Sequence, residues 1–225
     1  MAECKTSPEV GGMGHSVKRK EDPRFIRGQG NYVDDVVRPG MVFMDIVRSP
    51  YAHAKIKSIN TEKALAHPGV AAVITGETLK EYNLHMMPTL MSDTQMVLPI
   101  EKVCYQSQEV AAVVATDRYS AADGVELVEV EYEPLPVVVD PHKATDPDAP
   151  IIRDDKEGQE NNHIFHWEAG DKSGTDEIFQ NADVTVKKDI YLPRIHVASI
   201  ETCGCVSEFD SVTGQLTVWM TTQAP

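Results

Sequence analysis

The strongest constraint on the fold is a run of apolar residues of strand length, Glu109–Thr116 (EVAAVVAT), with polar residues on both sides. A strand that is apolar at nearly every position has both faces buried, so this run predicts a central strand. Asp117 follows at once, and aspartate is a preferred N-cap of helices. Tyr119, Ala122 and Val125 then fall at helical spacing and predict one face of a helix.

The residues after this helix alternate between apolar and acidic side chains. Glu129, Glu131 and Glu133 are separated by valine and tyrosine, which predicts a half-exposed strand. If buried, three carboxylates so close together would perturb one another's pKa values, as in acid–base pairs, but we favour a solvated strand face. Prolines break this strand, and valines at residues 137–139 resume it. The two patterns together predict a strand–helix–strand unit within a mixed α/β domain.

The chain before this unit shows the patterns of shorter elements. Residues 1–30 lack periodicity and indicate an extended arm. Pro39-Gly40 supplies a turn before an apolar run, and Asn60-Thr61 are helix-cap types. We predict strands at residues 41–47, 54–59 and 70–75, and short helices at residues 62–66 and 78–82.

The composition changes after residue 140 towards Pro, Asp, Asn, Gly and Lys, which indicates a linker of irregular chain. Beyond it we predict a helix over 176–182 capped by Thr175, a strand over 184–192, and a hairpin of strands 205–209 and 216–222. No residues follow that would cover this last sheet, so we expect the beginning of a second domain. The expected organisation is an arm over 1–30, an α/β domain over 31–140, a linker over 141–174 and an incomplete domain over 175–225.

Composition and charge exclude several classes of protein. The 225 residues carry 21 Lys and Arg against 35 Asp and Glu, a net charge of −14, so a nucleic acid or an anionic membrane surface is not an expected partner. No apolar run approaches the roughly 18–20 residues of a transmembrane helix. The polar, Gly-rich start has no apolar signal region, and four scattered cysteines do not make a disulfide framework. We therefore expect a cytoplasmic location.

The candidate sites lack the spacing that chemistry requires. The glycine-rich pieces Gly11–Gly14 and Gly28–Gly30 do not lie between a strand and a helix, so we interpret them as parts of the arm. His163 and His166 have no further ligand at a confirming spacing, and we expect ordinary packing. Cys203-Gly204-Cys205 provides at best half a metal site, and no Gly-x-Ser-x-Gly motif is present. The residues themselves show no self-contained catalytic centre.

Several segments nevertheless carry a specific pattern. They are Arg24–Asp35 (RFIRGQGNYVDD) with Pro39–Met41, Val47–Ile56 (VRSPYAHAKI), Gln108–Ala111 with Glu131–Pro136 (EYEPLP), and Gly214–Trp219 with Thr222–Pro225. Together these segments resemble the large, molybdenum-bearing subunit of the xanthine dehydrogenase/aldehyde oxidase family, and the resemblance covers nearly the whole chain. It implies an α+β fold, with a mixed-sheet α/β hammerhead domain followed by the start of a molybdopterin-binding domain.

The resemblance also implies a chemistry. Members of this family hydroxylate substrates at molybdenum held by a pterin, which is molybdopterin cytosine dinucleotide in bacterial members. They pass electrons to an iron–sulfur small subunit and an FAD medium subunit, in a dimer of heterotrimers. Gln223 matches the glutamine that hydrogen-bonds a molybdenum oxo ligand, and an amide NH₂ suits that role because it donates without displacing a ligand. No catalytic residue of the family falls within the 225 residues.

Within the family, Leu84–Leu90 (LHMMPTL) and Glu201–Cys205 (ETCGC) resemble the branch that oxidises carbon monoxide. That branch implies oxidation of CO with water to CO₂ and a cysteine-bound copper, whose loop would lie beyond residue 225. A hydroxylase of aldehydes or N-heterocycles and a non-catalytic module for subunit assembly are the alternatives. The chain alone is expected to be inactive.

Overall fold

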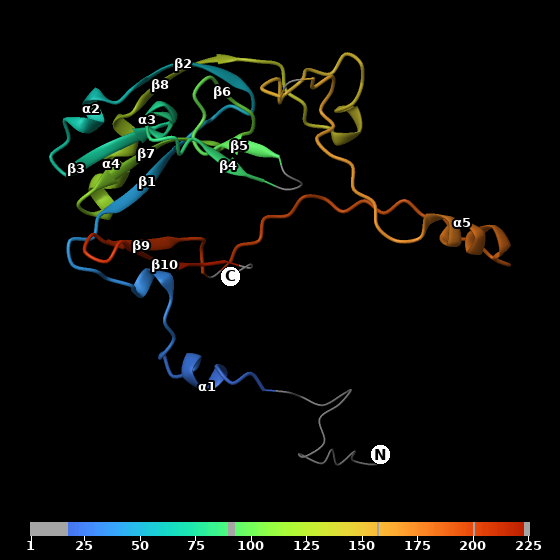
Figure 1. Cartoon of the computed structure of the whole chain (residues 1–225), viewed down its shortest axis with the longest axis horizontal. Helices are drawn as coiled ribbons and strands as arrows, with labels where there is room; N and C mark the ends of the chain where they lie inside the picture. Colours follow the sequence, from blue (N-terminus) through green and yellow to red (C-terminus); the bar gives the residue numbers. More distant parts are fainter. Residues whose placement is uncertain (1–17, 90–92, 157, 200, 223–225) are drawn as a thin grey trace. The chain divides into compact units, whose positions relative to one another are not determined.

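The computed structural model describes residues 18–89, 93–156, 158–199 and 201–222. The chain forms two compact units, one of Gly40–Lys188 and one that joins Met1–Pro39 to Asp189–Pro225. Within the described residues, no helix is both long and apolar enough to cross a membrane. Figure 1 labels the elements, which are α1 (Asp22–Phe25), η1 (Val33–Asp35), β1 (Phe43–Arg48), β2 (Ala54–Asn60), α2 (Glu62–Leu65), β3 (Val70–Thr75), α3 (Gly76–Glu81), β4 (Met86–Pro88), β5 (Thr94–Met96), β6 (Lys102–Val103), β7 (Glu109–Ala115), α4 (Arg118–Leu127), β8 (Glu129–Pro134), η3 (Pro141–Lys143), α5 (Lys172–Asn181), β9 (Cys205–Asp210) and β10 (Gln215–Met220).

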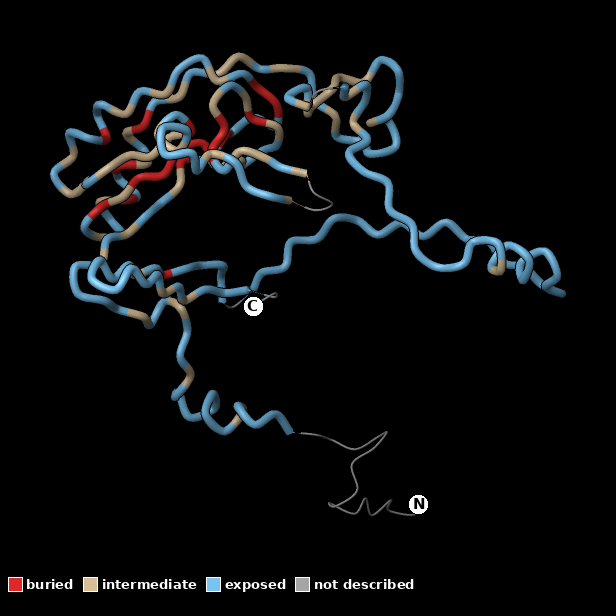
Figure 2. Tube along the Cα trace, in the orientation of Figure 1, coloured by how far each residue is buried: buried red, intermediate tan, exposed pale blue. Residues whose placement is uncertain are grey.

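The predicted central strand is confirmed. β7 lies between β1 and β3 in a three-stranded antiparallel sheet. Val110, Ala111, Val113 and Ala115 are buried, because one face of β7 packs against α4 and the other lies inside the unit. Figure 2 shows that most buried positions of the chain lie in this unit.

The helix that follows β7 is capped as predicted, and Val125 of the predicted face packs against the core. The Asp117 side chain accepts hydrogen bonds from the backbone N–H groups of Tyr119 (3.0 Å) and Ser120 (2.9 Å). Tyr119 is 84% exposed, however, and the buried residues of α4 are Ala121 and Gly124. A Cβ atom at Gly124 would lie 2.7 Å from Val113 Cγ1, so the missing side chain is what lets α4 approach β7.

A second antiparallel sheet contains the predicted half-exposed strand. Its order is β6-β2-β8, and Lys55 of β2 pairs with Glu133 of β8. The acidic residues of β8 form ion pairs with lysines, Glu133 with Lys57 and Glu129 with Lys63. The pKa of Glu133 is lowered chiefly by its hydrogen bond from Lys57. The solvated face is confirmed, and these carboxylates do not form an acid–base pair.

The α+β fold class is confirmed, and each described pairing between strands is antiparallel. The short strands β4, β5 and β6 were not predicted. Residues 137–139 do not resume a strand, since β8 ends at Pro134 and Val137 and Val139 are exposed. α5 begins before the predicted Thr175 cap, because Asp171 accepts from the Gly174 N–H at 3.0 Å.

The strand predicted over 184–192 is absent from the described chain. Its apolar side chains are exposed, among them Val186, Ile190 and Leu192. Period-2 alternation shows which face a strand would bury, but a strand also needs a neighbour to pair its backbone N–H and C=O groups. No described residue supplies that neighbour, so this prediction was wrong for the chain described. Residues 140–156 and 158–171 are largely irregular, as predicted. Of the arm predicted over 1–30, residues 1–17 lie outside the described chain, and residues 18–30 contain the short helix α1, so the described part is not extended throughout.

One loop of the β1–β7 sheet has strained backbone, at Ser107 with φ 65°. The Ser107 N–H donates to Ser49 O at 2.9 Å, which holds the loop in place. A non-glycine residue in this left-handed region costs about 1–2 kcal/mol. We expect Ser107→Gly to raise the free energy of unfolding by about 1 kcal/mol, after part of the gain is offset by the greater freedom of glycine in the unfolded chain. Urea denaturation measures this change, and Ser58→Gly, in β2, is the matched control that should lower stability.

Candidate functional site

The predicted cofactor residue Gln223 follows β10, the second strand of the β9–β10 hairpin, by three residues. The strands pair antiparallel as predicted, with Glu208 opposite Thr217 and Val206 opposite Trp219. At the turn, the Asp210 side chain accepts from the N–H groups of Val212 (2.8 Å) and Thr213 (3.3 Å). This local bonding explains why an Asp–x–x–x–Gly sequence closes the hairpin.

Arg38 connects the N-terminal segment to this hairpin. Its Nε and Nη2 atoms donate to Glu208 Oε1 at 3.1 and 2.9 Å, and Nη2 lies 2.8 Å from Glu208 Oε2. The guanidinium carbon also lies 5.6 Å from the centre of the Trp219 ring. Arg38 therefore contacts both strands of the hairpin, a link between residues that are 170 positions apart.

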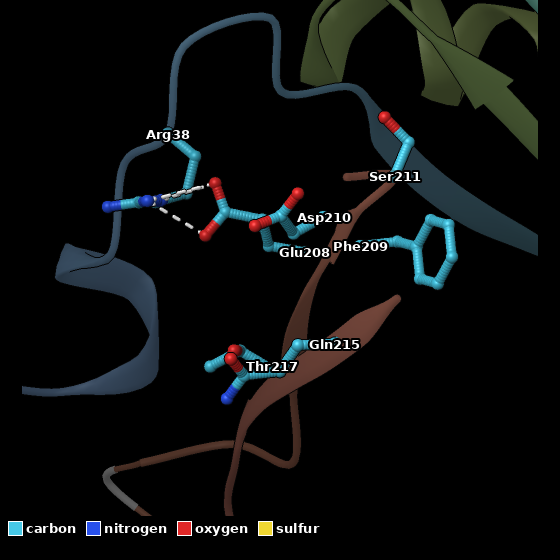
Figure 3. A pocket seen from close by; sticks show the side chains of 7 residues that line it. All are labelled: Arg38, Glu208, Phe209, Asp210, Ser211, Gln215 and Thr217. Atoms are coloured by element: carbon cyan, nitrogen blue, oxygen red, sulfur yellow. Dashed lines mark hydrogen bonds and ion pairs between the residues drawn. The ribbon is translucent and has the colours of Figure 1, made fainter. Parts of the chain in front are cut away.

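A pocket lies against this contact at the turn end of the hairpin (Figure 3). Figure 3 shows the Arg38 side chain directed at the Glu208 carboxylate, so its charge is already compensated. Hydrogen bonds from Thr213 and from the Val212 N–H hold the pKa of Asp210 below its ordinary value. Two carboxylates and one paired cation do not fit a phosphate-bearing ligand. The pocket is lined by Arg38, Glu208, Phe209, Asp210, Ser211, Gln215 and Thr217.

The opposite, open end of the hairpin has a different chemistry. Cys205 pairs with Met220 there, and the Thr221 N–H donates to Gly204 O at 3.1 Å. The described residues that follow β10, Thr221 and Thr222, carry hydroxyl groups, and residues 220–222 have no charged side chain. Neutral donors of this kind fit the oxo ligands and pterin of a molybdenum cofactor. Gln223 itself lies outside the described residues, and its role stays a prediction.

The other candidates from the sequence do not form sites. His163 and His166 are both exposed, so the expected packing was wrong; His166 Nε2 lies 3.0 Å from Glu168 Oε1. Cys203 and Cys205 are exposed free thiols. Among the described residues, no group of three or more His, Cys, Asp or Glu side chains could hold a metal ion.

A charge cluster that the sequence analysis missed ties the β4–β5 hairpin to the segment after residue 150. Asp93 Oδ1 lies 2.6 Å from Lys156 Nζ, and Asp93 Oδ2 lies 3.3 Å from Arg153 Nη1. Arg153 and Lys156 also donate to Thr94 O at 2.8 and 2.6 Å. Both cations come from one short segment, RDDK, but no pattern in the sequence links that segment to a residue 60 positions earlier.

This cluster predicts a pH dependence. The hydrogen bond from Lys156 is the main cause that lowers the pKa of Asp93 from 3.8 to about 2. A lowered pKa in the folded state stabilises the fold above the unfolded-state pKa, and this contribution is lost as the pH falls from about 4 through 2. We expect the ¹³C carboxyl resonance of Asp93 to titrate near pH 2. In Lys156→Met the midpoint should move upward, and an unchanged midpoint would contradict the assignment.

Known protein families match both the N-terminal and the C-terminal part of the chain. The model of the "aldehyde oxidase and xanthine dehydrogenase, a/b hammerhead domain" matches residues 27–136, and that of the "molybdopterin cofactor-binding domain" matches residues 155–225. The chain belongs to the aldehyde oxidase and xanthine dehydrogenase family. The unit that contains β7 thus carries the hammerhead domain, and the β9–β10 hairpin lies in the part matched to the molybdopterin-binding domain.

Individual relatives agree with this membership. The chain is 56% identical to the carbon monoxide dehydrogenase large chain of Afipia carboxidovorans, over 95% of this chain and 28% of that one. It is 54% identical to the corresponding chain of Hydrogenophaga pseudoflava, over 96% and 28%. The solved structure of a Cu,Mo-CO dehydrogenase in its carbon monoxide reduced state matches with a TM-score of 0.82 and 55% identity, over 97% of this chain and 29% of that chain. The chain spans less than a third of the length of these relatives.

Proposed function

We propose that this chain contributes the hammerhead domain and the first strands of the molybdopterin-binding domain to the large subunit of a molybdenum hydroxylase. The proposed reaction is oxidation of carbon monoxide: CO and H₂O give CO₂, two protons and two electrons. The observation that carries the proposal is the 56% identity to a carbon monoxide dehydrogenase large chain over 95% of this chain. The LHMMPTL and ETCGC segments, which resemble that branch, support it further.

The proposed cofactor is molybdenum bound to molybdopterin cytosine dinucleotide, with copper beside it. When bound, this group supplies the two-electron redox chemistry, and the protein orients it and excludes competing reactions. Gln223 would donate from its amide to an oxo ligand, and the neutral open end of the hairpin supports this role. Copper in the similar Cu,Mo-CO dehydrogenase supports copper here.

The proposed partners are an iron–sulfur small subunit and an FAD medium subunit, which would accept the two electrons within a dimer of heterotrimers. The relatives are named as large chains, which supports an assembly of several subunits. We also propose a cytoplasmic location. The domain division into 1–30, 31–140, 141–174 and 175–225 is kept as a proposal, supported by family matches at 27–136 and 155–225.

The second candidate function is a module for subunit assembly. It is favoured because one face of the hairpin carries apolar side chains that no described residue covers. Leu216, Val218 and Met220 are exposed on one side of β10. This candidate predicts that the chain captures the partner subunits without any metal bound. Such capture would assign the 225 residues to assembly and leave the chemistry to the rest of the subunit.

The deciding experiment uses the full-length subunit purified with its partner subunits. We expect molybdenum and copper near one per large subunit, and reduction of an acceptor dye with CO as the electron donor. Turnover of an aldehyde or an N-heterocycle without turnover of CO would instead favour the other hydroxylases of the family. Absence of molybdenum would refute the proposal.

A further inference from the structure

Part of the predicted linker is fixed to the hammerhead unit. Residues 151–156, which we call the strap, form neither a helix nor a strand. Arg153 and Lys156 of the strap pair with Asp93 at 3.3 and 2.6 Å, and Asp154 forms an ion pair with Lys102 of β6. The strap is therefore attached on both sides of β5, at Asp93 before it and at Lys102 after it.

The side chain of Asn162 shapes the chain on each side of the strap. Its Nδ2 donates to Ala144 O and Pro150 O, both at 2.9 Å, and its Oδ1 accepts from the Ile152 N–H at 2.8 Å. These hydrogen bonds join the strap to its own flanking residues and not to β5 or β6, so they hold its shape when its ion pairs are broken. We therefore expect the strap to move as a unit.

The strap covers Cys104, which follows β6. Cys104 Sγ donates to Ile152 O at 3.8 Å. Burial raises the pKa of the Cys104 thiol, and the thiolate is the form that reacts with electrophiles. The closed strap therefore opposes a reaction of Cys104 in two ways, by blocking access and by keeping the thiol protonated. Cys203 and Cys205, by contrast, are exposed.

The attachment of the strap is strong enough to keep it closed but separate from the core. The side chains of Asp93 and Arg153 are only 17% and 18% exposed, so their ion pair is screened by salt less than one on the surface. The contacts are nevertheless made by polar side chains of irregular chain, and such segments open at a lower free energy than core strands. We propose that the strap opens locally, by release of its ion pairs with Asp93 and Lys102, and that this opening controls access to the Cys104 thiol. Such a device does not depend on the proposed function.

The test labels the whole 225-residue chain with N-ethylmaleimide, a neutral thiol reagent, and measures each cysteine by mass spectrometry of its peptides. In the wild type we expect Cys104 to react about 100-fold more slowly than Cys203. Asp93→Asn removes the charge that Arg153 and Lys156 share, and we expect Cys104 to react about 10-fold faster, because the substitution weakens charge-assisted hydrogen bonds. Asp176→Asn makes the same change at an exposed ion pair of α5 and is the matched control, in which Cys104 should react as in the wild type.

A further variant separates opening of the strap from unfolding of the domain. Val113→Ala removes buried methyl groups from β7 and lowers the stability of the core, but leaves the side chains of the strap and of Asp93 as they are. Local opening leaves the rate of Cys104 labelling unchanged in this variant, whereas faster labelling would show that the thiol reacts from the unfolded chain and would refute the inference. An unchanged rate in Asp93→Asn, or a wild-type Cys104 that reacts as fast as Cys203, would refute it as well. If Asp93→Asn fails to fold, Lys156→Met decides: faster labelling of Cys104 supports the inference and an unchanged rate refutes it.

Discussion

Val113→Asp is expected to unfold the hammerhead domain. Val113 is 0% exposed at the centre of β7, between α4 and the neighbouring strands. The substitution removes a buried apolar side chain, worth about 1.5–3 kcal/mol, and places a carboxyl group where no described partner can hydrogen-bond it. We expect a loss of about 4 kcal/mol or more, which is a large part of the 5–15 kcal/mol that usually stabilises a domain.

Urea denaturation followed by circular dichroism measures this effect. Met44→Asp is the matched control, because Met44 lies on β1, the strand paired with β7, and is 59% exposed. The control should change stability by less than about 1 kcal/mol. Equal losses in the two variants would show that β7 is not the centre of the core.

Gln223→Leu is expected to have the largest effect on activity. Leucine has nearly the volume of glutamine but no amide, so the substitution removes the hydrogen bond proposed to reach an oxo ligand of the cofactor. Loss of a residue that supports a metal site typically costs 10–100-fold in activity, and we expect kcat for CO oxidation to fall by about that factor. Steady-state kinetics of the complete enzyme, with molybdenum content measured beside it, tests this prediction.

Gln180→Leu, in the exposed helix α5, supplies the control for this variant. It makes the same chemical change far from the open end of the hairpin in sequence, and wild-type kcat is expected. Wild-type kcat in Gln223→Leu, at full molybdenum content, would remove Gln223 from the cofactor contacts.

The parts of the fold that were predicted correctly are those whose pattern is local. The buried run of β7, the Asp117 cap and the β9–β10 turn each depend on neighbouring residues, and each is present in the structure. The face of α4 was predicted correctly only in part: Val125 packs against the core, but Tyr119 is exposed, because helical spacing does not distinguish a packed aromatic side chain from an exposed one. The face that approaches β7 uses Ala121 and Gly124, whose small size is what packing there requires.

The contacts of the candidate site could not be predicted in the same way. Arg38 meets Glu208 across 170 positions, and Asp93 meets Arg153 across 60. The local sequence around each residue does not predict which charged side chain it will contact, since charged residues are common on any surface. The resemblance to a family supplied Gln223, whereas the contacts of Arg38 and Asp93 became visible only when the chain was folded.

The order in which strands pair has a consequence for biosynthesis. Within the described residues, β1 and β3 each pair with β7 alone, and β2 pairs with the short β6 and along most of its length with β8. Sheets built from such distant segments form slowly, because the entropy of closing a long loop is lost before the strand pairing that compensates for it can form. On the ribosome, β1 and β3 therefore stay unpaired until the chain has emerged as far as Ala115, and β2 lacks β8 until Pro134 has emerged. Chaperone dependence during synthesis should accordingly be concentrated in this early interval.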